Sequence, residues 1–277
     1  MRIAITGASG YIGSNIAKSL AHEHQIYPVS HETSLDSMIK TLGDNKIEAV
    51  IHLASLFIPE HKSEDVAPLI KGNIIFGSEL LEAMRVVGVK KLINTGSSWQ
   101  YYEKDGFSGS CLYGATKNAF EEIGKFYVSA YGISITNLIL YDVYGPSDPR
   151  PKIIPHLLRL TRDPSGQSID MSAGEQKIFF THIDDIVRAY AISLSMLDQA
   201  DPQFRSYFLR DKTSINLKQL VALIEEFSHQ TLPISWGARP YREREIMTPF
   251  EQGDILPGWK PQISLRSGLK EIFDGGI

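Results

Sequence analysis

The chain has 277 residues, 43% of them hydrophobic and 22% charged, with a net charge of −4 at pH 7. This size allows a large buried core, and the negative balance argues against nucleic acid as the main partner. One cysteine excludes an intrachain disulfide and a cysteine-based zinc site, and the lack of a signal peptide or of an apolar run near the roughly 18 residues that span a bilayer favours a cytoplasmic protein without a membrane partner.

The first elements are a short strand over residues 2–5, a glycine-rich turn, and a helix over residues 11–20, in which apolar residues recur at helical spacing. In a strand-to-helix turn, such glycines indicate dinucleotide binding. Gly7 permits positive φ, Gly10 lets the backbone approach a pyrophosphate, and Gly13 lets the helix pack close to the strand. The spacing is Gly-x-x-Gly-x-x-Gly rather than the commoner Gly-x-Gly-x-x-Gly, so a glycine turn without a ligand is the alternative.

A second strand is expected over residues 25–29, followed by Ser30, His31 and Glu32. In a dinucleotide fold, an acidic residue at the end of this strand accepts the 2′-OH of NAD, and its absence leaves room for a 2′-phosphate. Glu32 comes slightly late for that role, whereas Ser30 and His31 could bond a phosphate. We therefore favour NADP(H) and leave NAD(H) open. The alternative is that both are ordinary loop residues and the cofactor preference is loose.

The run over residues 49–55 is continuously apolar and ends in small residues, which predicts a buried parallel strand. His52, within it, is interpreted as a packed structural histidine. The other histidines are scattered, so no metal site is expected. A helix over residues 73–84 and a strand over residues 91–95 follow, and that strand leads directly into Ser97.

Tyr113 and Lys117 stand four residues apart at the start of the next helix, so both project from one face. A free tyrosine titrates near pH 10, and both a lysine cation and an oxidised nicotinamide ring favour the phenolate. A pKa two to three units lower requires about 3–4 kcal/mol of differential stabilisation. Tyr113 could then exchange a proton with a substrate oxygen near neutral pH, while Ser97 hydrogen-bonds that oxygen and hydride moves at the attached carbon.

The rest of the chain carries fewer chemical signals. Helices are expected over residues 153–160, 183–196 and 217–227, the second packing back on the first domain. Three arginines follow between residues 239 and 244. Of these, Arg242 is the preferred diphosphate clamp, because arginine suits phosphate. The alternative is a solvated face balanced by the neighbouring glutamates.

Taken together, the chain resembles the extended short-chain dehydrogenase/reductases. The motifs that carry the resemblance are residues 6–13, residues 52–54, Asn73, Ser97, Tyr113 with Lys117, residues 141–146, residues 180–185 and residues 258–261. The resemblance covers the whole chain and implies an α/β fold, a Rossmann doubly wound parallel sheet of about seven strands with a small C-terminal substrate-binding lobe. Residues 1–150 would form the NAD(P)-binding domain, and residues 151–277 mainly the lobe, with about 178–210 returning to the Rossmann core.

The resemblance also implies the site residues. Ser97, Tyr113 and Lys117 would be catalytic, with Asn73 supporting Lys117 through water, although Asn73 could also be a helix N-cap. The cofactor-binding residues would be Gly7, Ser9, Gly10, Tyr11, Ile12, Gly13, Ser30, His31, Leu53, Ala54, Ser55, Tyr113, Lys117, Tyr141 and Val143. The substrate-binding residues would be Ser98, Trp99, Gln100, Asp142, Lys177 and Arg242.

Two substrate positions depart from the family pattern. Many relatives have Asn where Asp142 stands, and a carboxylate there would repel a diphosphate. Asp142 would then face a sugar hydroxyl or lie outside the site. Many relatives also have Arg where Lys177 stands, and a lysine keeps the charge but loses the bidentate geometry.

In this family the substrate is usually a nucleotide sugar. Ser98 and Trp99 replace the Asp-Glu pair of the sugar dehydratases, and Trp99 also replaces the cysteine of the GDP-fucose synthases, so neither activity is expected. The runs 95–100, 113–117 and 239–245 are similar to the CDP-abequose and CDP-paratose synthases, which reduce the C4 ketone of a CDP-3,6-dideoxyhexulose with NADPH. The resemblance thus implies an NADPH-dependent 4-ketoreductase that supplies sugars for surface polysaccharide such as the O-antigen of lipopolysaccharide. It also implies a homodimer formed through two helices per subunit.

Two other functions remain open. An NAD-dependent nucleotide-sugar 4-epimerase would use the same three catalytic residues, retain NAD tightly and consume no NADPH. A non-catalytic NAD(P)-binding regulator could share the scaffold. Such proteins can lose the tyrosine or the lysine, whereas this chain keeps both.

Overall fold

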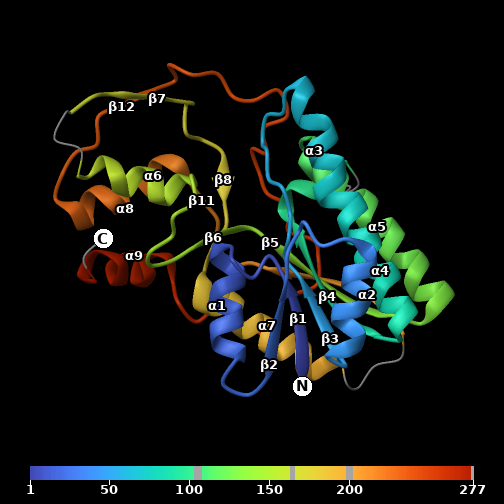
Figure 1. The fold of residues 1–277 in the computed structure, drawn as a ribbon. Helices are drawn as coiled ribbons and strands as arrows, with labels where there is room; N and C mark the ends of the chain where they lie inside the picture. Colours follow the sequence, from blue (N-terminus) through green and yellow to red (C-terminus); the bar gives the residue numbers. More distant parts are fainter. Residues whose placement is uncertain (103–107, 163–165, 198–201, 276–277) are drawn as a thin grey trace. The chain divides into compact units, whose positions relative to one another are not determined.

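The computed structural model describes residues 1–102, 108–162, 166–197 and 202–275 (Figure 1). The chain forms two compact units. Unit 1 comprises residues 1–140, 187–209 and 250–259, and unit 2 comprises residues 141–186, 210–249 and 260–277. No helix in the described ranges is both long and apolar enough to cross a bilayer.

This division differs from the expected one at three places. Unit 1 ends its first segment at residue 140 rather than 150. The returning segment is 187–209, which is shorter than the expected 178–210. Residues 250–259 also belong to unit 1, where residue 255 forms a bridge with Phe208. The sequence analysis marked residues 258–261 as a family motif but did not predict that residues 250–259 return to this unit.

Unit 1 contains a parallel six-stranded sheet in the order β2-β1-β3-β4-β5-β10 (Figure 1). Its strands are β1 (Arg2–Thr6), β2 (Gln25–Val29), β3 (Ala49–His52), β4 (Lys91–Ser97), β5 (Ser134–Leu140) and β10 (Phe204–Leu209). The predicted α/β Rossmann-like fold is confirmed, with six strands rather than about seven in the described part of this sheet. The segment between β2 and β3, residues 30–48, forms helix α2 (Leu35–Asp44) and its connections. It therefore supplies no further strand at the β2 edge of the sheet.

Helices cover both faces of this sheet. In Figure 1, α2, α4 and α5 lie on one face, and α1 and the part of α7 from residue 187 lie on the other. The elements are α1 (Tyr11–Leu20), η1 (Ser63–Asp65), α3 (Val66–Ile70), α4 (Phe76–Val87), η3 (Ser98–Gln100), α5 (Leu112–Tyr131) and α7 (Ile183–Leu197). The central strands β3, β4 and β5 are buried along almost their whole length because helices cover both faces. The core joins Met38, Leu80 and Phe120 from three helices to Val50 and Leu92 from the strands.

The helix expected from residue 73 begins differently. A π-helical turn, η2 (Lys71–Ile75), precedes α4 and holds Asn73 within a continuous run of helix. Asn73 is therefore not an N-cap. Such single π turns are rare and frequently lie at functional sites.

Unit 2 has its own core, formed by Tyr144, Leu157, Leu220, Ile224 and Leu269 with their neighbours. Its helices are α6 (Ile153–Leu160), α8 (Leu217–Ser228) and α9 (Leu265–Asp274). Its strands pair as β6 (Asp142–Tyr144) with β9 (Phe180–His182), β7 (Ile169–Met171) with β12 (Ile234–Trp236), and β8 (Lys177–Ile178) with β11 (Ile215–Asn216). The sequence spacing predicted α6 and α8 closely, since both are strongly amphipathic.

Candidate active site

The glycine turn after β1 requires its glycines. Gly7 has φ of +72°, and the Gly10 N–H donates to the Gly7 carbonyl at 3.0 Å. A Cβ on Gly13 would lie 2.1 Å from the Gly7 oxygen, so only glycine fits there. A Cβ on Gly7 would lie 2.7 Å from the Ala54 nitrogen, which brings the end of β3 against this turn. Because β2 and β3 flank β1, the turn lies where the chain switches direction across the sheet, the usual cofactor crevice.

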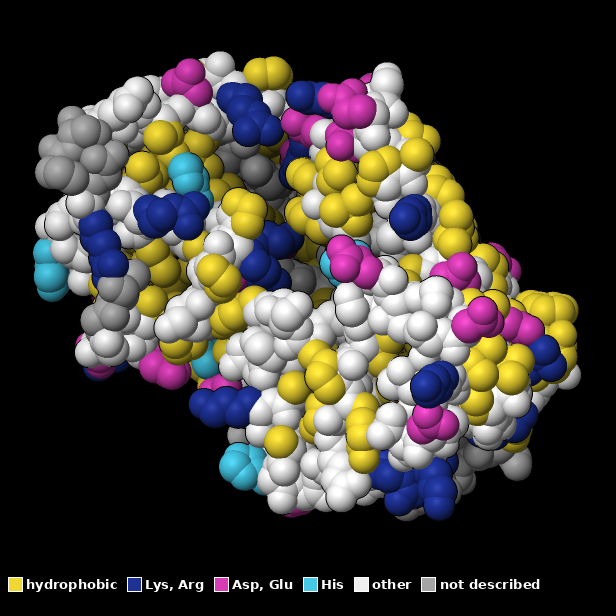
Figure 2. Space-filling model, in the orientation of Figure 1, with side chains coloured by type: hydrophobic (Ala, Val, Ile, Leu, Met, Phe, Trp, Pro, Cys, Tyr) yellow, Lys and Arg dark blue, Asp and Glu magenta, His cyan; other side chains and the backbone are white. Residues whose placement is uncertain are grey.

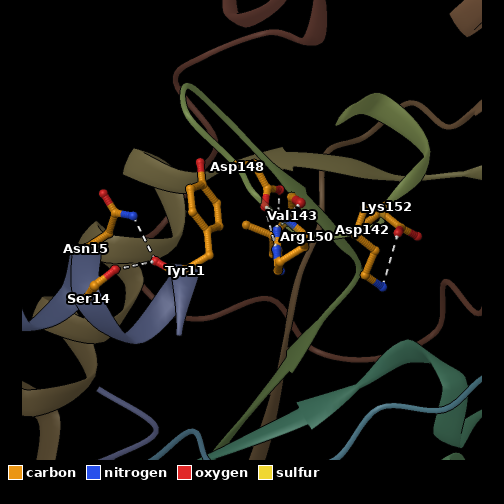
Figure 3. Close-up of polar contacts among 8 residues, drawn as sticks. All are labelled: Tyr11, Ser14, Asn15, Asp142, Val143, Asp148, Arg150 and Lys152. Carbon is orange, nitrogen blue, oxygen red and sulfur yellow. Dashed lines mark hydrogen bonds and ion pairs between the residues drawn. The ribbon is translucent and has the colours of Figure 1, made fainter. Parts of the chain in front are cut away.

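The N-terminus of α1 fits a dinucleotide pyrophosphate. Its N-cap is Gly10, which has no side chain to occupy the helix N–H groups, and its first turn has no acidic residue. Ser14 Oγ and Asn15 Nδ2 both donate to the Tyr11 carbonyl, at 3.1 and 2.8 Å (Figure 3). The first-turn N–H groups and the positive end of the helix dipole thus suit an anion.

The residues after β2 are open to solvent. Ser30 and His31 are exposed, and Ser30 Oγ accepts the Glu32 N–H at 3.3 Å, which closes a small turn. No Asp or Glu stands at the end of β2 itself. The assignment of Ser30 and His31 to the cofactor stays a prediction.

The end of β3 is organised by a buried hydroxyl. Thr6 Oγ1 accepts the Leu53 and Ala54 N–H groups, both at 3.1 Å, and lies 2.8 Å from His52 Nδ1. Burial lowers the pKa of His52 to about 3, with the Lys117 charge adding to the fall, so the imidazole is neutral at physiological pH. His52 is packed against Phe76 and Phe120, as the structural interpretation predicted.

The three predicted catalytic residues come together in unit 1. Tyr113 and Lys117 lie on one face of α5, both buried, and Ser97 is the last residue of β4. The Ser97 and Ser55 side chains lie near enough to the Tyr113 hydroxyl to favour its ionised form. Lys117 Nζ donates to the Thr95 carbonyl at 3.0 Å and lies 6.0 Å from the centroid of the Tyr113 ring.

The pKa of Tyr113 does not fall as expected. Burial raises it to about 12, against the opposing effect of the Ser97 and Ser55 side chains. Burial likewise lowers the pKa of Lys117 to about 8. Desolvation disfavours both the Tyr113 phenolate and the Lys117 ammonium. The ammonium lies 6.0 Å from the centroid of the Tyr113 ring, so the attraction between the two charges is too weak to reverse the effect of desolvation. The protein alone therefore presents a neutral phenol.

The Asn73 side chain joins the end of β3 to α5. Its Oδ1 accepts from the Leu56 N–H at 2.7 Å and from Ser55 Oγ at 3.1 Å, and its Nδ2 donates to the Leu56 carbonyl and to Thr116 Oγ1, each at 3.0 Å. An asparagine amide has two donor hydrogens and two acceptor lone pairs, so these contacts use all four. The Asn73 side chain thus ties Ser55 and Leu56 to Thr116 on α5, and its support of Lys117 through water stays a prediction.

An aromatic residue absent from the sequence prediction adjoins Tyr113. The Phe57 ring makes edge contacts with Tyr113, at 5.0 Å between centroids, and with Trp99, at 5.3 Å. Phe57 is 37% exposed. It follows β3 in a segment without strand or helix periodicity, so the sequence offered no signal for it. Ser98 and Trp99 are half-buried beside Ser97 and stay substrate-binding predictions.

The prediction that Gln100 binds the substrate requires a correction. Its side chain is fully buried, accepting the Ser97 N–H and donating to Glu121 and Asn118. These contacts argue against a direct contact between Gln100 and substrate.

In unit 2, Asp142 has a cationic neighbour that was not predicted from the sequence. Lys152 Nζ lies 3.9 Å from the Asp142 carboxylate (Figure 3). Close by, Arg150 binds Asp148 through two nitrogens, at 2.8 and 2.7 Å, and donates to the Val143 carbonyl at 2.7 Å. Lys152 partly offsets the repulsion expected between Asp142 and a diphosphate.

The remaining predicted residues of unit 2 differ in their surroundings. Arg242 forms a two-pronged pair with Glu245, at 2.8 Å for each contact, which matches the balanced-charge alternative rather than a clamp held ready for phosphate. The Lys177 main chain donates to the Met247 carbonyl at 3.0 Å, and its side chain is exposed. Tyr141 and Val143 are buried.

A hollow in unit 2, lined in part by Ser147, Arg159 and Glu271, includes none of the predicted site residues. No group of three or more His, Cys, Asp and Glu side chains among the described positions is arranged to hold a metal ion.

Comparison with known proteins gives concordant matches. The model described as the NAD dependent epimerase/dehydratase family matches residues 3–205. The CDP-abequose synthase of Salmonella muenchen is 29% identical over 98% of this chain and 97% of its own length. That of Yersinia pseudotuberculosis is 29% identical over 90% and 92%. The structure of UDP-glucuronic acid 4-epimerase from Bacillus cereus, with UDP-glucuronic acid and NAD, has a TM-score of 0.84 at 23% identity, covering 99% of this chain and 98% of that one, which shows a shared fold.

Proposed function

The chain belongs to the NAD dependent epimerase/dehydratase family, and from that premise we propose that it reduces the C4 ketone of a nucleotide-linked 4-keto-deoxy sugar with NADPH. The arrangement of Ser97, Tyr113 and Lys117 carries this proposal. A CDP-3,6-dideoxyhexulose is the proposed substrate, because two CDP-abequose synthases match nearly the whole chain. Most of the proposed cofactor-binding residues belong to unit 1, as do Ser98 and Trp99, whereas the proposed substrate-binding residues Asp142, Lys177 and Arg242 belong to unit 2.

When bound, NADPH supplies the hydride. The Gly7–Gly13 turn and the N-terminus of α1 would hold its pyrophosphate, and Ser30 and His31 its 2′-phosphate. The Tyr113 hydroxyl donates a proton to the ketone oxygen, and the Ser97 hydroxyl hydrogen-bonds the same oxygen as negative charge develops on it. Lys117 binds the nicotinamide ribose and places a positive charge near Tyr113.

The direction of proton transfer supports a reductase. Burial keeps Tyr113 as a neutral phenol, the form that gives a proton to a ketone oxygen. The reduced nicotinamide ring is uncharged and leaves this state unchanged, whereas the oxidised ring is a cation that favours the phenolate. A 4-epimerase must begin by removing a proton from a hydroxyl, which calls for the phenolate.

The 4-epimerase is the second candidate. The same three side chains could serve it in both directions. The family description includes epimerases in general, and the Bacillus cereus structure is that of a 4-epimerase. Oxidised NAD held permanently in the site would supply the cation that lowers the Tyr113 pKa. The two candidates therefore differ in the redox state of the resting cofactor.

The first experiment follows the near-ultraviolet absorbance of NADPH with CDP-4-keto-3,6-dideoxyglucose. Loss of absorbance only when the sugar is present would support the reductase, and a parallel run with NADH would test the assignment of Ser30 and His31. No loss, together with NAD released when the purified protein is denatured, would overturn the reductase and favour the epimerase.

The companion prediction concerns Tyr113→Phe. Removal of the phenol hydroxyl should lower kcat on the order of 10²- to 10⁴-fold and leave NADPH binding near wild type, because the ring and Lys117 remain. Rapid-mixing kinetics and NADPH fluorescence titration measure the two effects. Tyr127→Phe is the matched control, since Tyr127 lies on the same helix and its hydroxyl contacts Glu82. Unchanged turnover in Tyr113→Phe would contradict the proposed chemistry.

A further inference from the structure

A buried carboxyl group lies beside the proposed catalytic residues, and their chemistry does not use it. Glu121 is 9% exposed and stands one helical turn beyond Lys117 on α5. Its Oε1 accepts from Gln100 Nε2 at 2.6 Å and from Asn137 Nδ2 at 2.5 Å. Burying a carboxyl group is costly unless hydrogen bonds compensate. Both donors are polar side chains rather than backbone groups.

Gln100 connects this carboxyl group to the end of β4. Its Oε1 accepts the Ser97 N–H at 2.7 Å, and its Nε2 also contacts Asn118 Oδ1 at 3.0 Å. Ser97 Oγ in turn accepts the Trp99 N–H at 3.3 Å in the η3 turn. The position of the Ser97 main chain, and hence the direction of its hydroxyl, depends on the Gln100 amide.

The chemistry of the carboxylate explains why it stands there. Oε1 of Glu121 is an acceptor for both amides, so the NH₂ end of Gln100 faces Glu121 and its carbonyl end faces the Ser97 N–H. Asn137 is held in the same sense, because its Nδ2 faces Glu121 while its Oδ1 accepts from Asn94 at 2.8 Å. An apolar residue at position 121 would leave the Gln100 amide without this constraint.

We propose that Glu121 is a positioning residue for the reaction. It orients Gln100, which fixes the Ser97 main chain and thereby directs the Ser97 hydroxyl toward Tyr113 and the reacting oxygen. This inference rests on the proposed function, because it takes Ser97 and Tyr113 as the reacting pair.

The test uses four variants of the full chain: Glu121→Leu, Glu121→Gln, Gln100→Leu and the double variant Glu121→Leu/Gln100→Leu. For each we would measure kcat, KM for both substrates, and the thermal midpoint. Glu122→Leu is the matched control, because Glu122 is the next residue on α5 and its exposed carboxylate pairs with Lys125.

Each single leucine variant should lower kcat on the order of 10- to 100-fold with little change in KM, since small misplacements of reacting groups have effects of that size. Glu121→Gln keeps an acceptor oxygen and should retain most of kcat. The double variant removes both ends of the Gln100–Glu121 bond, so its loss of stability should be smaller than the sum of the two single losses. Its kcat should stay low, because the Ser97 N–H has still lost its acceptor.

A merely structural role makes the opposite prediction for the double variant. Recovery of kcat together with the thermal midpoint would overturn the proposal, and so would a loss in Glu121→Gln as large as in Glu121→Leu. If Glu121→Leu does not fold, Glu121→Gln and the double variant decide the question. If wild-type protein does not oxidise NADPH with the keto sugar, the proposed reductase fails separately. The same variants are then compared in the 4-epimerase assay, which depends on the same Ser97–Tyr113 pair.

Discussion

At the scale of single residues, burial controls the charges of the site. Burial lowers the pKa of Lys117 from 10.5 to about 8, and the charge of Glu121 only partly opposes the fall. Between these two pKa values the unfolded chain holds a proton that the folded protein has lost. Stability should therefore rise as the pH increases from about 8 to about 9.5, by up to about 1.4 kcal/mol per pH unit.

Comparison with Lys117→Met isolates this effect, because methionine does not titrate. The difference in unfolding free energy between wild type and Lys117→Met should change in favour of wild type across this pH range, as measured by urea denaturation. The measurements stay below pH 10, near which tyrosines of the unfolded chain ionise, so that buried tyrosines contribute little to the pH dependence of stability. Lys125→Met, an exposed lysine of the same helix, is the control. A difference that stays constant with pH for Lys117→Met would contradict the prediction.

At the scale of elements, the packing of α1 against β1 depends on Gly13. A Cβ there would lie 2.1 Å from the Gly7 oxygen and 2.8 Å from its carbonyl carbon, and backbone atoms cannot move aside as a flexible side chain can. Gly13→Ala should therefore shift α1, weaken NADPH binding by at least about tenfold, and destabilise the protein by about 1–3 kcal/mol. Fluorescence titration and urea denaturation measure the two effects.

Gly43→Ala is the matched control for this prediction. Gly43 lies in α2, and an added Cβ there would meet the Val87 side chain at 3.6 Å, an ordinary contact. Alanine in a helix gains about 0.5–1 kcal/mol over glycine, so this variant should be neutral or slightly more stable, with unchanged NADPH binding. Similar losses in both variants would show that the Gly7–Gly13 approach is not specific.

Local sequence patterns predict the bounds of elements better than they predict long-range contacts. The bounds of β2 and α6 coincide with the predicted ones, because local periodicity and turn residues decide them. The π turn around Asn73 has no such signature, since its residues keep ordinary helical spacing. The position of Gln100 depends on Glu121 and Asn137, which are distant in sequence, and the raised pKa of Tyr113 depends on burial that only the complete fold creates. Arg242 differs, because its partner Glu245 lies three residues away and was visible as the alternative.

At the scale of the whole molecule, α4 and α5 present an apolar surface. Phe126 is 54% exposed, Val86 48% and Tyr131 37%. The rings of Phe126, Tyr127 and Tyr131 contact one another along α5. Hydrophobic side chains are visible at the right edge of Figure 2, over the region where α5 lies in Figure 1. Exposed apolar side chains gathered on one surface mark a candidate interaction site.

We propose that a second copy of the chain covers this patch. Paired around a two-fold axis, α4 and α5 of each subunit would pack as four helices, and each Phe126 would become buried. Phe126→Glu would then place a charge in the interface without a partner, which costs several kcal/mol. Wild-type protein at micromolar concentration should sediment as a dimer, and Phe126→Glu as a monomer.

Met247→Glu provides the control for this change. Met247 is 41% exposed and belongs to unit 2, away from α4 and α5 in the chain, so its variant should stay dimeric. A monomeric wild type, or two dimeric variants, would contradict the assigned surface. Ser97, Tyr113 and Lys117 all come from one chain, so the Phe126→Glu monomer should keep its KM for NADPH. Any fall in its kcat should come from α5 alone, because this helix carries Tyr113 and Lys117 and would lose the support of the partner subunit.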